Sequence, residues 1–312
     1  MREQNLQQPF NVPILFLIFN RQKETHRVFQ EIKKIKPSSL FIAADGPRRD
    51  FNSDYHLCEA TKNVIQIDWE CEVHKLYRTE NLGCRVAVSS AIDWFFSHVK
   101  KGIIIEDDCL PSLSFFSFCE NMLNKYEDSF DIMSISGANH QSGIVRGNDS
   151  YFFSKIPHIW GWATWRRAWD LYDVNMKEFP EFHNSNKIKN VFKYLPAQKE
   201  QTRILKKIYN GADTWDYQWA FTLYKNTGFS ISPNKNLVKN IGFGNNSTHF
   251  FEKSSKFREM IQQETDDPIR HPLIIERNEE ADDYEARTIF APKPLSIIIL
   301  KFFSHIKRKL LK

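Results

Sequence analysis

Short runs of apolar and β-branched residues alternate with longer segments of helical periodicity in the first half of the chain. The strand-like runs cover residues 12–19, 40–44, 72–77 and 102–105. Between them, apolar residues recur three or four positions apart around 28–35, 56–67 and 86–99, which is the spacing of one helix face. Strands that alternate with helices predict a parallel sheet covered by helices on both faces. A Phe-rich helix at 114–126 and a strand at 132–136 extend the pattern.

The fourth of these runs ends in three consecutive acids. Residues 102–105 read Gly-Ile-Ile-Ile, and Glu106, Asp107 and Asp108 follow them. An uninterrupted apolar run predicts a strand buried on both faces, and open α/β sheets bind ligands at the carboxyl ends of such strands. Crowded carboxylates favour a hard cation, so we expect Mg²⁺ or Mn²⁺ here, with phosphate oxygens as further ligands. A solvated acidic loop is the alternative, which the preceding buried strand disfavours.

Polar residues also follow the other predicted strands. Asn20 and Arg21 follow the first strand, Asp45 follows the second, and Arg85 follows the third. Because the carboxyl ends of parallel strands meet at one edge, these side chains and the acids are expected to converge. Residues 19–23 read Phe-Asn-Arg-Gln-Lys and contain no glycine. This argues against a dinucleotide fingerprint, a Walker A loop or the glycine-rich loop of sugar nucleotidyltransferases.

The middle of the chain concentrates tryptophan. Four of them fall within ten residues: Trp160, Trp162, Trp165 and Trp169. Trp165 and Trp169 are four apart and are expected to face the core from one helix. Trp160 and Trp162 flank Gly161 ahead of that helix, where a glycine lets a ligand approach the backbone and aromatic rings stack on sugars or bases.

Two further motifs carry candidate chemistry. Residues 214–219 read Thr-Trp-Asp-Tyr-Gln-Trp and are expected to open a helix whose first turn holds Asp216. Asp216 is either a first-turn acid that favours the helix dipole or a general base at the rim of an aromatic pocket. Residues 240–249 form a Gly/Asn-rich loop that ends in His249, which is either a structural histidine or a group on a loop that closes over a ligand.

Composition and charge narrow the class of protein. The chain has 312 residues, 41% of them hydrophobic, and a formal net charge of +5. Six positive charges and no acid fall within 291–312, so the body is nearly neutral and nucleic-acid binding is not expected. The five cysteines form no CxxC pair, which favours a reducing cytosol over a disulfide framework or a zinc site. The polar start and the lack of an apolar stretch of about 18 residues predict neither a signal peptide nor a membrane span.

The C-terminal part of the chain reads as an appendage. Residues 251–294 are rich in charge and proline and are expected to form a linker. In 295–312, apolar residues at helical spacing alternate with lysine and arginine, which predicts a basic amphipathic helix at an anionic membrane surface. Docking of this helix on the body or on another subunit is the alternative.

In their order along residues 10–250, these features resemble glycosyltransferases of the GT-A fold, specifically bacterial relatives of the N-acetylglucosaminyltransferase I type. In that type, an apolar strand followed by Glu-Asp-Asp holds the metal through the last acid, here Asp108. Its Gly-Trp pair is similar to Gly161 and Trp162, and its Trp-Asp with the catalytic base is similar to Trp215 and Asp216. The family reads Trp-Asp-Asp-Trp where this chain has Trp-Asp-Tyr-Gln-Trp, so the base assignment rests on Asp216 alone.

The resemblance implies a Rossmann-like GT-A domain with a nucleotide-sugar half at about 10–137 and an acceptor half at about 138–250. Phe243, Gly244 and residues 247–249 look like the loop over the donor, with His249 at the metal or the diphosphate. The remaining residues expected at the nucleotide sugar are Phe19, Asn20, Arg21, Asp45, Arg85, Glu106 and Asp107.

The activity implied is an inverting, metal-dependent transfer of a sugar, with GlcNAc, GalNAc or Gal expected, from a UDP-sugar to a hydroxyl group. The acceptor would be a cell-surface glycan such as lipooligosaccharide or a lipid-linked polysaccharide. The expected location is the cytoplasmic face of the bacterial plasma membrane, with the C-terminal helix as a peripheral anchor. Two other functions stay open: a metal-dependent nucleotidyltransferase or phosphoesterase, and a non-catalytic glycan-binding or membrane-associated module.

Overall fold

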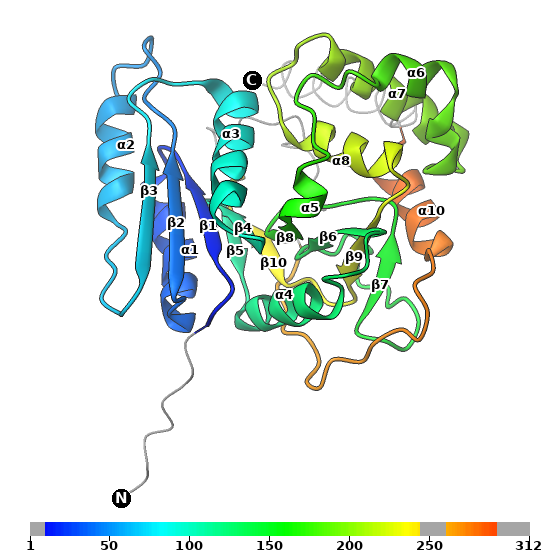
Figure 1. Ribbon diagram of the computed structural model, residues 1–312, viewed down its shortest axis with the longest axis horizontal. Helices are drawn as coiled ribbons and strands as arrows, with labels where there is room; N and C mark the ends of the chain where they lie inside the picture. Colours follow the sequence, from blue (N-terminus) through cyan, green and yellow to red (C-terminus); the bar gives the residue numbers. More distant parts are fainter. Residues whose placement is uncertain (1–9, 244–259, 292–312) are drawn as a thin grey trace, which may run out of the picture.

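The computed structural model describes residues 10–243 and 260–291, which form a mixed eight-stranded sheet with helices on both faces and a two-stranded ribbon beside it (Figure 1). The strands are β1 Ile14–Ile18, β2 Ser39–Ala44, β3 Glu72–Tyr77, β4 Lys101–Glu106, β5 Cys109–Pro111, β6 Ile132–Ser136, β7 Tyr151–Ser154, β8 Trp162–Trp165, β9 Phe229–Pro233 and β10 Val238–Asn240. The helices are α1 Gln22–Ile35, α2 Asp54–Asn63, α3 Gly83–His98, α4 Leu113–Lys125, α5 Arg166–Trp169, α6 Phe179–Asn184, the 3₁₀ helix Lys187–Asn190, α7 Leu195–Tyr209, α8 Asp216–Lys225 and α10 Glu279–Thr288.

The strand order in the large sheet is β3-β2-β1-β4-β8-β6-β9-β7. Strands β1 to β4 pair in parallel, as the alternation of strands and helices predicted. Beyond β4 the sheet is mixed, because β8 runs antiparallel to both β4 and β6, and β7 runs antiparallel to β9. The predicted α/β class with a mainly parallel sheet is confirmed. The antiparallel strands differ because loops, and not crossover helices, lead into them.

The two faces of the sheet are covered by different helices, and β1 shows how the sequence divides between them. Ile14 and Phe16 belong to the cluster with α1 and α4. Leu15 and Leu17 belong to the cluster with α3 and α8 on the other face. This follows from the alternation of side chains along a strand. The isoleucines at 103–105 are fully buried because β4 lies between β1 and β8 in the middle of the sheet.

The tryptophan-rich segment forms β8 and the short helix α5, and not one helix after a loop. Trp165 and Trp169 are 2% and 3% exposed, so their predicted core position is confirmed. They face opposite sides of the sheet, however, because Trp165 ends the strand and only Trp169 is helical. The ring centroids in the cluster on the α3 and α8 face lie 5.3 to 6.2 Å apart among Trp162, Trp169, Trp215 and Trp219.

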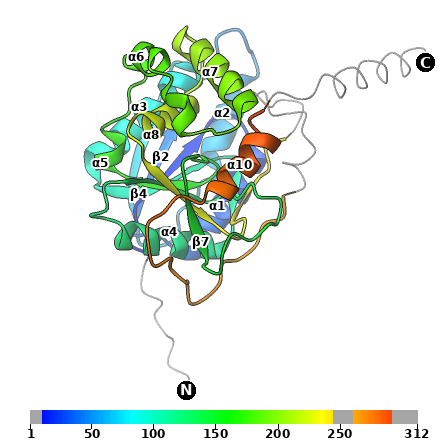
Figure 2. The same cartoon turned by 90° about the vertical axis from the view of Figure 1, so that its right-hand side faces the viewer.

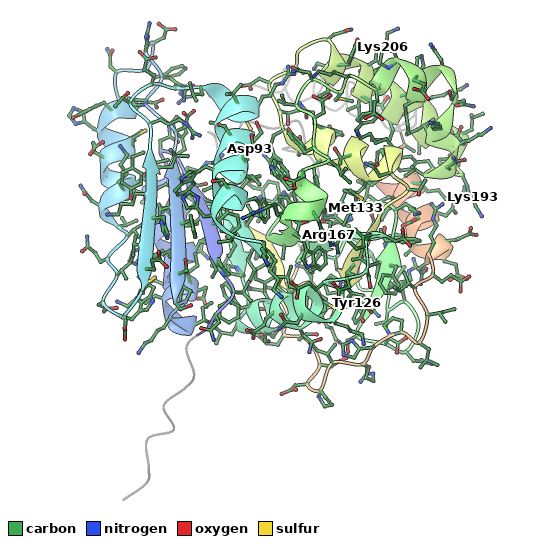
Figure 3. All side chains as sticks on the ribbon, viewed as in Figure 1. Asp93, Tyr126, Met133, Arg167, Lys193 and Lys206 are labelled. Atoms are coloured by element: carbon green, nitrogen blue, oxygen red, sulfur yellow. The ribbon has the colours of Figure 1, made fainter. Side chains whose placement is uncertain are left out.

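Arg167 of α5, labelled with Tyr126 in Figure 3, binds the segment that follows α4. Its guanidinium donates hydrogen bonds of 3.0 Å to the main-chain oxygens of Tyr126, Glu127, Ser129 and Ile132. These carbonyls belong to the turn between α4 and the start of β6 and lie outside the hydrogen bonds of the helix. Arg167 therefore has a structural role that joins α5 to the segment between α4 and β6.

Residues 260–291 belong to the fold, which corrects the predicted linker over 251–294. Helix α10 packs on β7 and α7 (Figure 2), and its Ala281, Asp282, Glu285 and Ala286 are buried. The acids of this segment form ion pairs, so its high content of charged residues does not mean that it is solvated throughout. Asp282, for example, accepts from Arg277 Nε at 2.6 Å.

Replacing Asp282 with alanine is expected to lower the free energy of unfolding by about 3 kcal/mol, because it leaves the mostly buried guanidinium of Arg277 without its carboxylate. Asp282 is 2% exposed and also accepts from Ser154 Oγ at 2.5 Å. Urea denaturation measures the change. Asp283→Ala is the matched control, because its pair with Arg287 lies on the solvent side of the same helix and should matter little. Equal losses in both variants would contradict a core position for this segment.

His249 and the segment 295–312 lie outside the described residues. The expectations of a closing loop and of a basic amphipathic helix therefore stay predictions. Within 10–243 and 260–291, none of the helices combines the length and apolar character needed to cross a bilayer.

Candidate active site

A cavity of about 570 Å³ opens beside the carboxyl ends of β1 and β4. Its walls come from the turn after β4, residues 157–160, helices α7 and α8, and the segments 240–243 and 289–291. Among the residues singled out in the sequence, the wall contains Arg21, Glu106, Asp108, Trp160 and Asp216. The sheet thus brings the acids, the arginine after β1 and the acid that opens α8 to one cavity, although they are far apart in the chain.

The acidic turn is held rigidly between two strands. Strand β4 ends at Glu106, and the chain turns at Asp107 and Asp108 before it continues as β5, which pairs with β10. The Asp107 side chain turns inward, where its Oδ2 accepts a hydrogen bond of 3.1 Å from Phe19 N at the end of β1. Ile241 N donates to the Asp108 main-chain oxygen at 2.7 Å. These contacts leave the carboxylates of Glu106 and Asp108 facing the cavity.

Arg21 is the cation that the described residues place at this turn. Its Nη1 lies 3.4 Å from Asp107 Oδ1 and 2.5 Å from Asp108 Oδ2. Burial opposes the charge of Arg21, but the nearby carboxylates outweigh burial and raise its pKa. Burial, with the charges of the two neighbouring acids, raises the pKa of Glu106 well above its usual range. Burial also raises the pKa of Asp107 to about 7 in spite of Arg21, so a further cation at this turn would favour the ionised forms of both acids.

The donor set at this turn fits a hard divalent cation. Glu106 and Asp108 offer only oxygen, the ligand type that Mg²⁺ and Mn²⁺ take together with phosphate and water. Gly242 permits the close approach of the segment after β10, since a Cβ there would lie 2.2 Å from Asp108 Oδ2. In the described parts of the chain, no group of three or more His, Cys, Asp or Glu side chains is arranged to hold a metal by itself. Phosphate and water are the further ligands that an ion held by Glu106 and Asp108 would take.

Asp216 opens α8 on the wall of the same cavity, as the sequence predicted for the start of this helix. The hydroxyl of Thr214 donates to Asp216 Oδ1. Buried rings on either side, Trp215 and Trp219, anchor the first turn in the core. The charge of Asp216 also raises the pKa of Glu106, although less than burial and the two adjacent acids do. The two carboxylates therefore interact electrostatically. A carboxylate that is held in place and open to a cavity can accept a proton from a bound hydroxyl.

Five of the seven strand-end residues predicted at the nucleotide sugar are not part of the cavity wall: Phe19, Asn20, Asp45, Arg85 and Asp107. Asn20 Nδ2 donates to Asp54 Oδ1 at 3.0 Å. The Asp45 carboxylate accepts from Leu82 N at 3.1 Å and so orders the loop before α3. Arg85 Nη2 donates to a main-chain oxygen at 2.6 Å in another loop. Their polar groups are thus engaged within the fold, because a position at a strand end does not determine where a side chain points.

Trp162 differs from its predicted role as a ring that stacks on a ligand. Its side chain is fully buried in β8, with its ring centroid 5.7 Å from that of Trp215, so no ligand reaches it. Trp160, which lies outside the strand, lines the cavity instead. Gly161 has φ +60°, and a Cβ there would lie 2.8 Å from Val238 Cγ2. The glycine therefore serves the close approach of the chain to β10.

Two histidines that the sequence did not single out complete an aromatic wall. The rings of His140 and His158 lie 4.1 Å apart, and that of Trp160 lies 5.2 Å from His140. Phe243 extends this column, 5.9 Å from Trp160. All four line the cavity. The only signal for His158 was its place directly before the tryptophan-rich segment, which by itself indicates no role. Aromatic faces of this kind suit the apolar face of a sugar ring.

No protein-family model matches this sequence, and a search of curated proteins found no match either. Among solved structures, the chain is similar to a mannosyltransferase from Pyrobaculum calidifontis in complex with GDP-Man and Mn²⁺, at 11% identity and a TM-score of 0.38, over 70% of this chain and 74% of that one. It is also similar to a UDP-glucose pyrophosphorylase complexed with UDP-glucose, at 10% identity and a TM-score of 0.32, over 51% and 78% of the two chains. Mouse xyloside xylosyltransferase 1 gives 9% identity and a TM-score of 0.31, over 69% and 82%. At these TM-scores, function has to be argued from the cavity itself.

Proposed function

We propose that this protein is an inverting, metal-dependent glycosyltransferase that moves GlcNAc, GalNAc or galactose from a UDP-sugar to a hydroxyl group. The observation that carries the proposal is that Asp108 and Asp216 line one cavity. A sugar that leaves a nucleoside diphosphate needs positive charge at the phosphate and a base at the attacking hydroxyl. The acidic turn with Arg21 supports the first requirement, and Asp216 supports the second.

The residues would divide the reaction as follows. A divalent ion held by Asp108, with Glu106 beside it, would supply charge to the leaving diphosphate. Arg21 contacts Asp108 in this structure, and its remaining donors are suited to phosphate oxygens. Asp216 takes the proton from the acceptor hydroxyl as that oxygen attacks the anomeric carbon. Because attack comes from the face opposite the leaving group, the configuration at this carbon inverts.

The other two functions explain less of the site. A non-catalytic glycan-binding module would use the aromatic wall, but it gives no reason for carboxylates whose pKa values burial has raised. A nucleotidyltransferase would use the acidic turn, but residues 19–23 offer no glycine-rich loop to hold a triphosphate. The transferase uses both features in one reaction.

The acceptor that we propose is a cell-surface glycan, such as lipooligosaccharide or a lipid-linked polysaccharide. The end of the cavity formed by α7 and the segment after α10 combines apolar residues, Ile204, Ile208 and Phe290, with the charged Glu200 and Arg203. An amphiphilic acceptor would match this combination. We propose that the basic segment 295–312 holds the protein at the cytoplasmic face of the bacterial membrane, where such an acceptor would lie.

The proposed function predicts metal-dependent release of UDP from one donor. The assay would offer UDP-GlcNAc, UDP-GalNAc, UDP-Gal and GDP-mannose with Mn²⁺, with Mg²⁺ and with a chelator. We expect UDP release from one UDP-sugar when an acceptor is present, and slow release by hydrolysis when it is not. No UDP should be released in the presence of the chelator. Pyrophosphate release from UTP with a sugar phosphate would instead identify a nucleotidyltransferase. If equilibrium dialysis also detects no metal-dependent binding of UDP, the transferase function is wrong and a glycan-binding module is favoured.

A further inference from the structure

Glu285 on α10 is a buried acid whose ionisable hydrogen-bond partner lies on the cavity wall. Its side chain is 5% exposed, and its Oε2 lies 2.9 Å from Nε2 of His158. Its Oε1 accepts from Nε2 of Gln141 at 2.7 Å, and Gln141 Oε1 in turn accepts from Arg146 Nε at 2.8 Å. A buried carboxylate is costly unless such bonds are made. The chain of contacts therefore determines the orientation of each member.

The bond to Glu285 requires a proton on Nε2 of His158. A carboxylate only accepts, so the proton of the ring must be on Nε2. Nδ1 receives no hydrogen bond from the described residues and is not a buried atom. In the neutral ring, Nδ1 is then an acceptor on the cavity side. The ring of His140, 4.1 Å away, and the bond of 3.1 Å from His158 N to Ser136 Oγ hold the residue in place.

We propose that His158 recognises the acceptor sugar by accepting a hydrogen bond from one of its hydroxyls through Nδ1, and that Glu285 is the positioning residue for this ring. The inference rests on the proposed function, because it places an acceptor in the same cavity as Asp216. Trp160 and His140 line the same cavity as His158. A site built to bond one hydroxyl discriminates strongly against sugars that lack it.

Helix α10 itself provides the comparison that separates this role from simple packing. Asp282, one turn earlier, is as deeply buried as Glu285. Its partners Ser154 and Arg277, however, are not part of the cavity wall. Asp282 already joins α10 to β7 through Ser154, and its partner Arg277 donates to the main-chain oxygen of Asn190. Glu285 instead joins the helix to the wall that faces Asp216.

The variant Glu285→Gln tests the positioning role because the network dictates how glutamine would lie. Gln141 still donates toward position 285, so the amide oxygen must face Gln141 and the amide nitrogen must face His158. His158 Nε2 would then accept, and its proton would move to Nδ1. Long-range ¹H–¹⁵N spectra of ¹⁵N-histidine protein report this change directly, with the His158 signals assigned from His158→Gln. We expect the Nε2–H form in the wild type and in Asp282→Asn, and the Nδ1–H form in Glu285→Gln.

The same samples, with UDP and Mn²⁺ present, are then titrated with the methyl β-glycosides of galactose, glucose and N-acetylglucosamine. At least one should move the Nδ1 resonance of His158 in the wild type. Its affinity should be about tenfold weaker in Glu285→Gln and unchanged in Asp282→Asn. If Glu285→Gln does not fold, loss of glycoside binding in His158→Gln, seen by ligand-detected NMR, carries the test.

Two outcomes overturn the inference: no glycoside moves the His158 resonance, or Glu285→Gln keeps both the tautomer and the affinity of the wild type. Binding of UDP with Mn²⁺, followed by tryptophan fluorescence, separates this failure from that of the proposed function. If UDP binds and His158 does not respond to glycosides, the transferase function stands and the acceptor contact is wrong. If His158 responds and no nucleotide binds, the cavity recognises a sugar and the transferase function is wrong.

Discussion

Asp216→Asn is expected to reduce sugar transfer by about 10³-fold while it leaves donor binding nearly unchanged, because an amide cannot take the proton of the acceptor hydroxyl. Asparagine keeps the size of the side chain and still accepts the bond from the Thr214 hydroxyl, so the start of α8 should not move. The loss should therefore appear in kcat, with a much smaller change in the KM for the donor.

The measurement is steady-state UDP release with acceptor present, combined with equilibrium binding of UDP and Mn²⁺ to each variant. Asp213→Asn is the matched control, three residues earlier. Its carboxylate accepts from Arg85 N at 2.8 Å and from Cys84 N at 3.2 Å, so it caps α3, a role that asparagine can also fill. Transfer by Asp213→Asn should stay within a few fold of the wild type. Full activity in Asp216→Asn would show that another group is the base.

Asp108→Asn is expected to remove the dependence of turnover on Mn²⁺ or Mg²⁺ and to lower kcat/KM for the donor by at least about 10²-fold. The amide has no charge with which to hold the ion, and neutral oxygen is a weaker ligand for a hard cation. Arg21 would lose its ion pair with Asp108 but can still donate to the amide oxygen, and it keeps the longer pair with Asp107. The defect should therefore concern the charge at the diphosphate and not the fold.

Titration of Mn²⁺ in the presence of UDP, followed by electron paramagnetic resonance of the free ion, measures the metal directly. Asp93→Asn is the control, since Asp93 of α3 (Figure 3) lies outside the cavity wall, where its carboxylate accepts from Trp169 Nε1 at 2.7 Å. It should bind Mn²⁺ with UDP as tightly as the wild type. Tight Mn²⁺ binding by Asp108→Asn would contradict the assignment of Asp108 as the metal ligand.

Much of the nucleotide half was predictable because its signals are local. The apolar runs gave four parallel strands at nearly their observed bounds, and the isoleucines before Glu106 placed the acidic turn at the carboxyl end of a central strand. Asp216 was placed at the start of a helix for the same reason, since helix starts depend on neighbouring residues. Arg21 was predicted at the same edge of the sheet because it comes directly after the first strand.

The second half was less predictable because its structure depends on distant partners. The four-residue spacing of Trp165 and Trp169 favours one helix. Pairing with β4 and β6 instead places Trp165 in strand β8, where Trp162 is also buried. The charges of α10 indicated a segment exposed to solvent. In the structure, however, Asp282 and Glu285 are buried because they pair with Arg277 and His158. Arg277 lies only five residues before Asp282, but His158 and Glu285 are 127 residues apart, so no local window of sequence contains that second pair.

The sequence by itself thus determined the α/β class, the parallel strands and the acids at their ends, because hydrophobic periodicity and strand length act over a few neighbouring residues. Only the tertiary structure decided which side chains share the cavity. Arg85, Asp45 and Asn20 bond elsewhere within the fold, whereas Glu285, 127 residues away from His158, reaches the wall through α10. Side-chain direction depends on the partners that packing brings within reach, and those partners come from distant parts of the chain.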